Sequence, residues 1–169
     1  MKKLSLIISI AFTIILLDGC FSVKYSFSGA NVGDAKTCSV QYFPNRAQIV
    51  NGNLSQQLTD ALKDKIQSET SLTLINGIGD VDFEGSITGY STQATAIQGN
   101  ETAAQNRFTI SVKVKYTNPL QPDFEFDKNF SRYRDYESTM SFESAQSKYV
   151  EEILEEIVED IFNAAFVNW

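Results

Sequence analysis

The stretch from Arg107 to Thr117 constrains the fold more than any other part of the chain. Polar and apolar side chains alternate along it without a break. Because successive side chains of a β-strand point to opposite faces, this pattern predicts a strand with one buried face and one wet face. A sheet built on such strands needs cover on one side only. The apolar positions are Phe108, Ile110, Val112, Val114 and Tyr116.

Two amphipathic segments can supply that cover. The first carries an apolar stripe at helical spacing from Leu54 to Ile66, with Asn53 as the expected N-cap and Gln56 as its partner in a capping box. The second is the closing segment, whose broad apolar stripe runs from Val150 to Ala165. Its other face is acidic, and we interpret it as a solvated helix face rather than as a paired-carboxylate active site. Its acids are Glu151, Glu152, Glu155, Glu156, Glu159 and Asp160.

Further strands are expected on either side of the first helix and in a hairpin. Alternation predicts strands at 38–42, 72–75 and 81–89, and Gly85 and Gly89 suggest a bulge or a close crossing in the last of these. Residues 91–105 are polar and irregular, which indicates a long loop. Residues 118–123 form a turn that leads into a partner strand with Phe124, Phe126 and Phe130. The prediction is an α+β two-layer sandwich: a mixed sheet of about four strands with two amphipathic helices on one face, over residues 36–169.

The N-terminus has the layout of an export signal. Lys2 and Lys3 precede an apolar stretch, Leu4–Leu17, that is too short to span a bilayer. Leu17, Gly19 and Cys20 resemble the end of a bacterial lipoprotein signal, although Asp18 stands where a small uncharged residue is usual. We therefore predict a signal peptide over 1–19, a lipid on Cys20 and a flexible tether over 20–35. The alternative is an ordinary signal peptide with a chance cysteine.

Cys38 is the only other cysteine. It lies in an alternating strand pattern, so we expect a buried thiol that acts as a small hydrophobic residue. A Cys20–Cys38 disulfide belongs to the alternative in which Cys20 carries no lipid.

Composition excludes several functions. The chain has no histidine and a net charge of −7, which removes histidine-based catalysis and metal sites and argues against nucleic acid as a partner. No phosphate-binding glycine loop, nucleophile elbow or metal-ligand spacing occurs. We expect neither an enzyme nor a bound cofactor other than the covalent lipid.

Basic residues are concentrated between Gln105 and Arg134, a segment that contains six basic and three acidic residues. Arg107, Lys113 and Lys115 share the polar side of one strand, and we expect Arg132 and Arg134 to extend this patch from the partner strand. The patch is a candidate site for an anionic ligand such as lipopolysaccharide. The alternative is a solvated sheet face.

Several stretches resemble one family. They are Lys36–Asn45, Leu58–Leu62, Asp82–Tyr90 and Gln105–Ile110. Together with the lipoprotein-like start and the acidic closing helix, they are similar to LptE, the lipopolysaccharide-assembly lipoproteins, in their Bacteroidetes-type form.

The resemblance implies a fold and a function. It implies two helices on one side of a four-stranded sheet, and a non-enzymatic protein, anchored in the outer membrane by lipid and facing the periplasm. Such a protein plugs the LptD β-barrel and assists the insertion of lipopolysaccharide. The alternative function is a generic envelope lipoprotein that acts as a scaffold for another membrane machine.

Replacing Cys20 by alanine tests the lipid anchor. Cys20→Ala should release the protein from membranes or stall its processing, because the acyl chains provide the membrane affinity, at about 0.8 kcal/mol per buried methylene. Membrane fractionation and intact-mass analysis measure this. A wild-type chain that carries no acyl group and begins at another residue would contradict the prediction.

Overall fold

The computed structural model describes residues 30–49, 51–95 and 105–167. The predicted signal peptide, Cys20, positions 21–29 of the tether and the segment around Gln98 lie outside these residues. The elements follow the chain as β1 (Thr37–Val40), α2 (Leu54–Glu69), β2 (Thr73–Leu74), β3 (Val81–Thr95), β4 (Gln105–Thr117), the 3₁₀ helix η1 (Pro122–Phe124), β5 (Phe126–Glu137) and α3 (Phe142–Phe166).

The described strands form a single mixed sheet in the order β2-β1-β3-β4-β5. β1 is parallel to both β2 and β3, whereas β3, β4 and β5 are joined as antiparallel neighbours. The predicted α+β class and the antiparallel hairpin are confirmed. The sheet has five strands rather than about four, and the short strand expected at 72–75 is one of them, at the edge beside β1.

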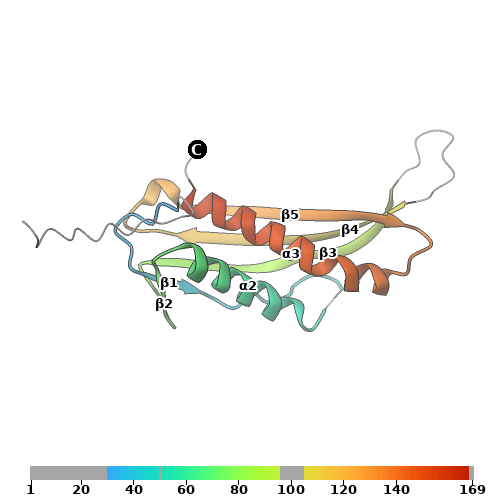
Figure 1. Ribbon diagram of the computed structural model, residues 1–169, viewed down its shortest axis with the longest axis horizontal. Helices are drawn as coiled ribbons and strands as arrows, with labels where there is room; N and C mark the ends of the chain where they lie inside the picture. Colours follow the sequence, from blue (N-terminus) through green and yellow to red (C-terminus); the bar gives the residue numbers. More distant parts are fainter. Residues whose placement is uncertain (1–29, 50, 96–104, 168–169) are drawn as a thin grey trace, which may run out of the picture.

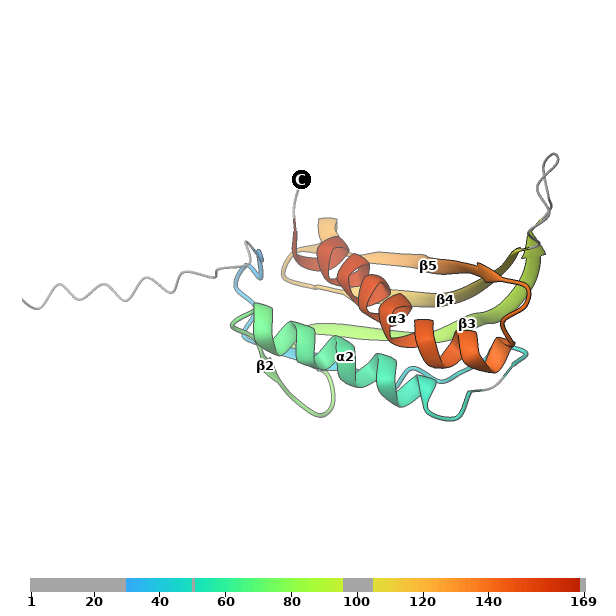
Figure 2. The ribbon, with the colours of Figure 1, turned by 45° about the vertical axis from the view of Figure 1, so that its right-hand side comes forward.

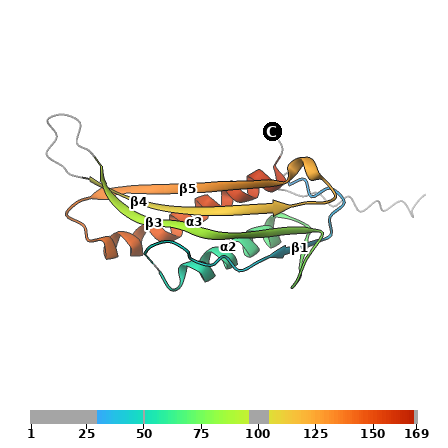
Figure 3. The ribbon, with the colours of Figure 1, turned by 180° about the vertical axis from the view of Figure 1, so that it is seen from behind.

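Both helices pack on one face of this sheet (Figures 1 and 2). Side chains from β1, β3 and β4 and from the inner stripes of α2 and α3 form a single buried core. Phe83, Tyr116 and Phe166 join strand and helix in it, with ring centroids 4.7–5.8 Å apart. No helix of the described residues lies on the opposite face of the sheet, as the view from behind shows (Figure 3).

The central hairpin is longer than the sequence indicates. The predicted loop over 91–105 is wrong at both ends, since Ser91–Thr95 belong to β3 and Gln105 begins β4. Thr95 pairs with Gln105, and the register continues unbroken from there to Gly89. The side chains here are polar and mostly not buried, so the hydrophobic alternation that identifies a strand is absent.

Gly85 and Gly89 have the roles that their positions suggested. The register of β3 against β4 shifts between Ile87 and Gly89. A Cβ atom at position 85 would lie 2.1 Å from the Lys113 carbonyl oxygen and 2.7 Å from the Phe43 ring. Only glycine lets Phe43 pack on the sheet here.

The two helix starts compare differently with the prediction. α2 begins at Leu54 with Asn53 at the N-cap position, as expected, but the Asn53 side chain makes no cap bond and its backbone is helical rather than extended; the predicted capping box does not form. α3 begins at Phe142, well before Val150, and Ser141 caps it by accepting from the Ser144 amide at 3.1 Å. Polar residues around Ala145 obscure the buried stripe in these first turns.

Substitutions on the two sides of α3 test this packing. Ile157 is fully buried and Glu155 is exposed. Ile157→Ala should lower the free energy of unfolding by about 2–5 kcal/mol, because it leaves a cavity. Glu155→Ala should change it by less than about 0.5 kcal/mol. Denaturant unfolding measures both, and equal losses would show that the faces of α3 are misassigned.

Candidate interaction surface

The candidate surface is the face of the sheet that the helices leave bare, which we call the outer face. The strand registers place alternate residues of β3, β4 and β5 on it. Its centre carries small hydroxyl side chains, and the Ser111 and Ser131 hydroxyl oxygens lie 2.9 Å apart. Tyr133 is its one large aromatic side chain, and the Arg107 guanidinium stacks 3.8 Å from the centre of that ring.

Arg107, Lys113 and Lys115 lie on the outer face, as predicted, but each is paired with an acid. Arg107 donates two hydrogen bonds to Asp135, at 2.8 and 2.9 Å. Lys113 lies 3.1 Å from Asp127, and Lys115 lies 2.6 Å from Glu84. These pairs are about half exposed, so each contributes little to stability, roughly 0–1 kcal/mol.

The outer face is therefore not a positive patch. The strand registers put five acids beside the three bases, and an anionic ligand would have to displace ion pairs that already exist. The binding of lipopolysaccharide by these three residues stays a prediction. The acids are Asp82, Glu84, Asp127, Asp135 and Glu137.

Arg132 and Arg134 do not extend the patch, which corrects the sequence-based expectation. Arg132 pairs in register with Ile110, and Arg134 pairs with Phe108. Both therefore project from the helix side of β5, opposite to Arg107. The alternation within β5 already carries this signal, because Arg132 and Arg134 have the same parity as Phe126 and Phe130, which lie on the apolar side.

These two arginines bind α3 instead. Arg132 donates to both carboxylate oxygens of Asp160, at 2.6 and 2.7 Å. Arg134 donates to Glu156 at 2.6 and 3.1 Å and to Glu152 at 3.1 Å. The acidic side of α3 is thus only partly a solvated face: one row of its acids fastens the helix to the edge strand.

Ion pairing also lowers the pKa of two acids on α3, Glu156 and Glu159. Hydrogen bonds from the Arg134 guanidinium lower the pKa of Glu156. On the other side of α3, the Lys65 ammonium lies 2.6 Å from Glu159 and lowers the pKa of that carboxyl. Lys65 belongs to α2, so ion pairs hold α3 both to β5 and to its neighbouring helix.

Cys38 is buried and free, as predicted for a small hydrophobic residue. Burial, with a smaller contribution from Asp82, raises the pKa of its thiol to about 12. The thiol is therefore unreactive near neutral pH.

The described ranges hold no group of three or more acidic, histidine or cysteine side chains that could bind a metal ion. Neither α2 nor α3, nor any other helix in those ranges, reaches the length and hydrophobicity that a membrane-spanning helix requires.

At the start of the domain, Ala30 and Val32 pack against the core, and the Asn31 amide donates to the Phe166 carbonyl at 2.7 Å. The end of the predicted tether thus lies on the domain, next to the last turn of α3.

Two helices on one face of an open mixed sheet, with a polar opposite face, define the fold as a two-layer α+β domain. It is similar to lipoprotein B from Nitrosomonas europaea, with a TM-score of 0.50 and 10% identity over 82% of this chain and 86% of that chain. It is also similar to a protein from Xanthomonas campestris, with a TM-score of 0.50 and 8% identity over 79% of this chain and 84% of that chain. Identities this low show the fold alone.

The sequence identifies the family. The model of LptE, described as lipopolysaccharide-assembly, matches residues 35–165, so the chain belongs to the LptE family of lipopolysaccharide-assembly lipoproteins. No curated protein sequence matches the chain.

Removing the arginine that fastens α3 tests the ion pairs. The carboxyl of Glu156 has a lowered pKa, so its pairing stabilises the protein at neutral pH and is lost as the pH falls through the pKa of the folded state. Arg134→Gln should cost about 1 kcal/mol near pH 7, because both partners are partly exposed. The difference from wild type should shrink as the pH falls through the lowered pKa of Glu156, because the protonated carboxyl no longer forms the ion pair.

Thermal unfolding across this pH range is the measurement. Arg46→Gln is the matched control, since Arg46 is exposed and its side chain makes no ion pair in the described ranges. A constant difference between Arg134→Gln and wild type at every pH would mean that the arginine acts through packing rather than through charge.

Proposed function

We propose that this protein is a lipid-anchored lipoprotein of the outer membrane, facing the periplasm, that partners an LptD-type β-barrel. In this role it fills the barrel as a plug and assists the assembly and insertion of lipopolysaccharide. The family match over residues 35–165 supports the process. The basic start, the apolar stretch and Cys20 support the anchor.

The observation that carries the partnership is the bare outer face. A sheet face with no helix on it must meet water or a polar partner. The lumen of a membrane β-barrel is polar, and the outer face offers hydroxyls, such as those of Ser111 and Ser131, and ion pairs such as Lys115–Glu84. Each of the three bases is already paired with an acid, so the face can be covered without leaving any of these bases unpaired.

The second candidate is an envelope lipoprotein that acts as a scaffold for another machine. The two functions differ in what accompanies the protein out of detergent-solubilised outer membranes. A plug should co-purify with one large barrel protein in a fixed ratio, whereas a scaffold of another machine should not.

Depleting the protein tests the proposed function. We expect the amount of correctly assembled LptD-type barrel to fall and surface lipopolysaccharide to fall with it, because the barrel would lack the domain that supports its assembly. Immunoblots under conditions that separate folded from unfolded barrel, together with surface labelling of lipopolysaccharide, measure both. An unrelated outer-membrane barrel is the control. Normal barrel and lipopolysaccharide levels after depletion would leave only the scaffold function.

A further inference from the structure

The edge of the sheet beside β1 is incomplete. β2 covers β1 only at Thr37 and Cys38. The last bond from this side is donated by the Ile75 amide to the Cys38 carbonyl at 2.9 Å. On its other side β1 continues further, since the Gln41 amide still donates to the Phe83 carbonyl of β3 at 2.8 Å. The chain after Val40 therefore has a strand on one side and none on the other.

This leaves a row of strand-edge backbone groups without a neighbour. The amides and carbonyls of a strand point alternately to its two sides. Because Cys38 bonds toward β2 and Gln41 toward β3, the backbone groups of Val40 and Tyr42 point to the open side. They have no backbone hydrogen-bond partner in the described ranges.

The segment that leaves β2 is held away from this opening. It crosses the outer side of β1 so closely that a Cβ atom at Gly79 would lie 2.9 Å from the carbonyl carbon of Cys38. The Gly79 backbone amide donates to the Ser39 hydroxyl at 2.9 Å, and the side-chain amide of Gln41 donates to the Gly77 carbonyl at 3.0 Å. With the crossing fixed in this way, residues 75–79 cannot continue β2 along the edge.

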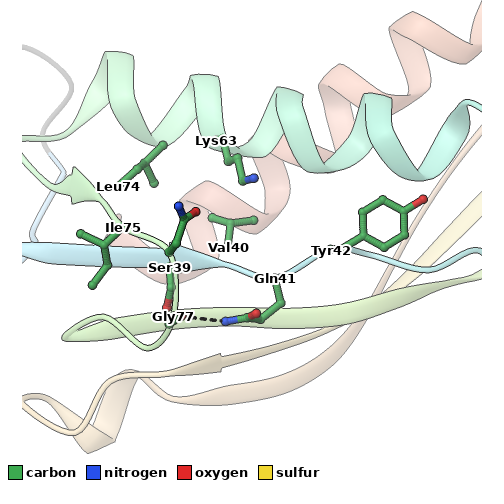
Figure 4. A pocket seen from close by; sticks show the side chains of 9 residues that line it. Ser39, Val40, Gln41, Tyr42, Lys63, Leu74, Ile75 and Gly77 are labelled. Atoms are coloured by element: carbon green, nitrogen blue, oxygen red, sulfur yellow. Dashed lines mark hydrogen bonds between the residues drawn. The ribbon is translucent and has the colours of Figure 1, made fainter.

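A slot of about 320 Å³ lies at this point, between the end of β2, the edge of β1 and α2 (Figure 4). Val40 and Leu74 form part of its wall, and Lys63 reaches toward it from α2. Lys63 is the one charged side chain among its described lining residues, and it makes no ion pair with any described residue. Two of its apolar lining side chains are exposed, Tyr42 by 57% and Ile75 by 38%.

The opposite edge of the sheet is different. β5 carries charges on both of its faces along its whole length, and such charges discourage the addition of another strand. The open side of the chain at Val40–Tyr42 differs: the exposed apolar side chains of Tyr42 and Ile75 lie there, and Lys63 is the one charged residue among the described residues that line the slot. The charges on β5 are Asp127, Lys128, Arg132, Arg134, Asp135 and Glu137.

We propose that the open edge of β1 at Val40–Tyr42, which we call the β1 edge, binds an extended segment of a partner protein as an added strand. The segment continues the place of β2 and bonds to the backbone of Val40 and Tyr42. It carries an acidic side chain on its helix-facing side, opposite Lys63, and apolar side chains that cover Tyr42 and Ile75. This surface lies apart from the outer face, and the proposal does not depend on the barrel partnership.

A synthetic peptide provides the probe: a short chain that alternates valine with threonine and carries one glutamate on the valine side. A second peptide has lysine in place of that glutamate. Fluorescence titration of the full-length protein in detergent should give binding of the glutamate peptide at least about fivefold tighter than that of the lysine peptide. Lys63→Glu should reverse this order.

Hydrogen–deuterium exchange of the same complex locates the peptide. The amides of Val40 and Tyr42 should exchange fast in the free protein and become protected with the glutamate peptide. Tyr42→Pro removes one edge donor without touching the ladder to β3, and it should weaken binding at least about tenfold. Tyr42→Thr is the matched control: it removes the ring but keeps the amide, so it should retain most of the binding.

Three results would overturn the proposal. The first is protection along β5 instead of β1. The second is equal binding of the two peptides, or no binding of either. The third is equal loss of affinity in Tyr42→Pro and Tyr42→Thr, in protein that circular dichroism shows to be folded.

Discussion

Burial of one sheet face under α2 and α3 is the interaction on which the other features of the molecule depend. Phe83 and Tyr116 on the strands meet Phe166 at the end of α3, and aromatic contacts of this kind add to the large hydrophobic gain of burial. Both α2 and α3 cover this face of the sheet. The outer face must therefore be stable in contact with water or with a polar surface, and its small hydroxyls and paired charges meet that requirement.

α3 connects this core to the two edges of the domain in different ways. Toward β5 its acids bind Arg132 and Arg134, so the edge strand is joined to the helix layer by charge. Toward the other edge it contacts α2 through Glu159 and Lys65, and the sheet there ends in the two-residue strand β2. One edge is thus protected by charges on both faces, while the other leaves backbone groups of β1 open. The bare outer face and the open edge of β1 are therefore two separate surfaces of the domain.

The sequence was sufficient to predict those elements in which buried and exposed side chains alternate regularly. The alternation in β4 and the stripes of α2 and α3 predicted these elements, because each has one apolar side. It was insufficient where the choice depends on contacts between elements. Ser91–Thr95 extend β3 through pairing with β4 and without an apolar pattern, and the acids of α3 that Arg134 binds could not be identified from the sequence. The basic patch was inferred from one strand, so the acids that neutralise it from β3 and β5 were missed.

Site-specific photo-crosslinking in intact outer membranes tests most directly whether the bare outer face is the one that meets the barrel. Ser131 is exposed on the outer face and Glu155 is exposed on the helix layer, so a photoreactive side chain can be placed at either position. The account predicts a strong adduct with a single large barrel protein from position 131 and a much weaker one from position 155. An adduct from position 155 alone, or none from position 131 in correctly localised protein, would contradict it.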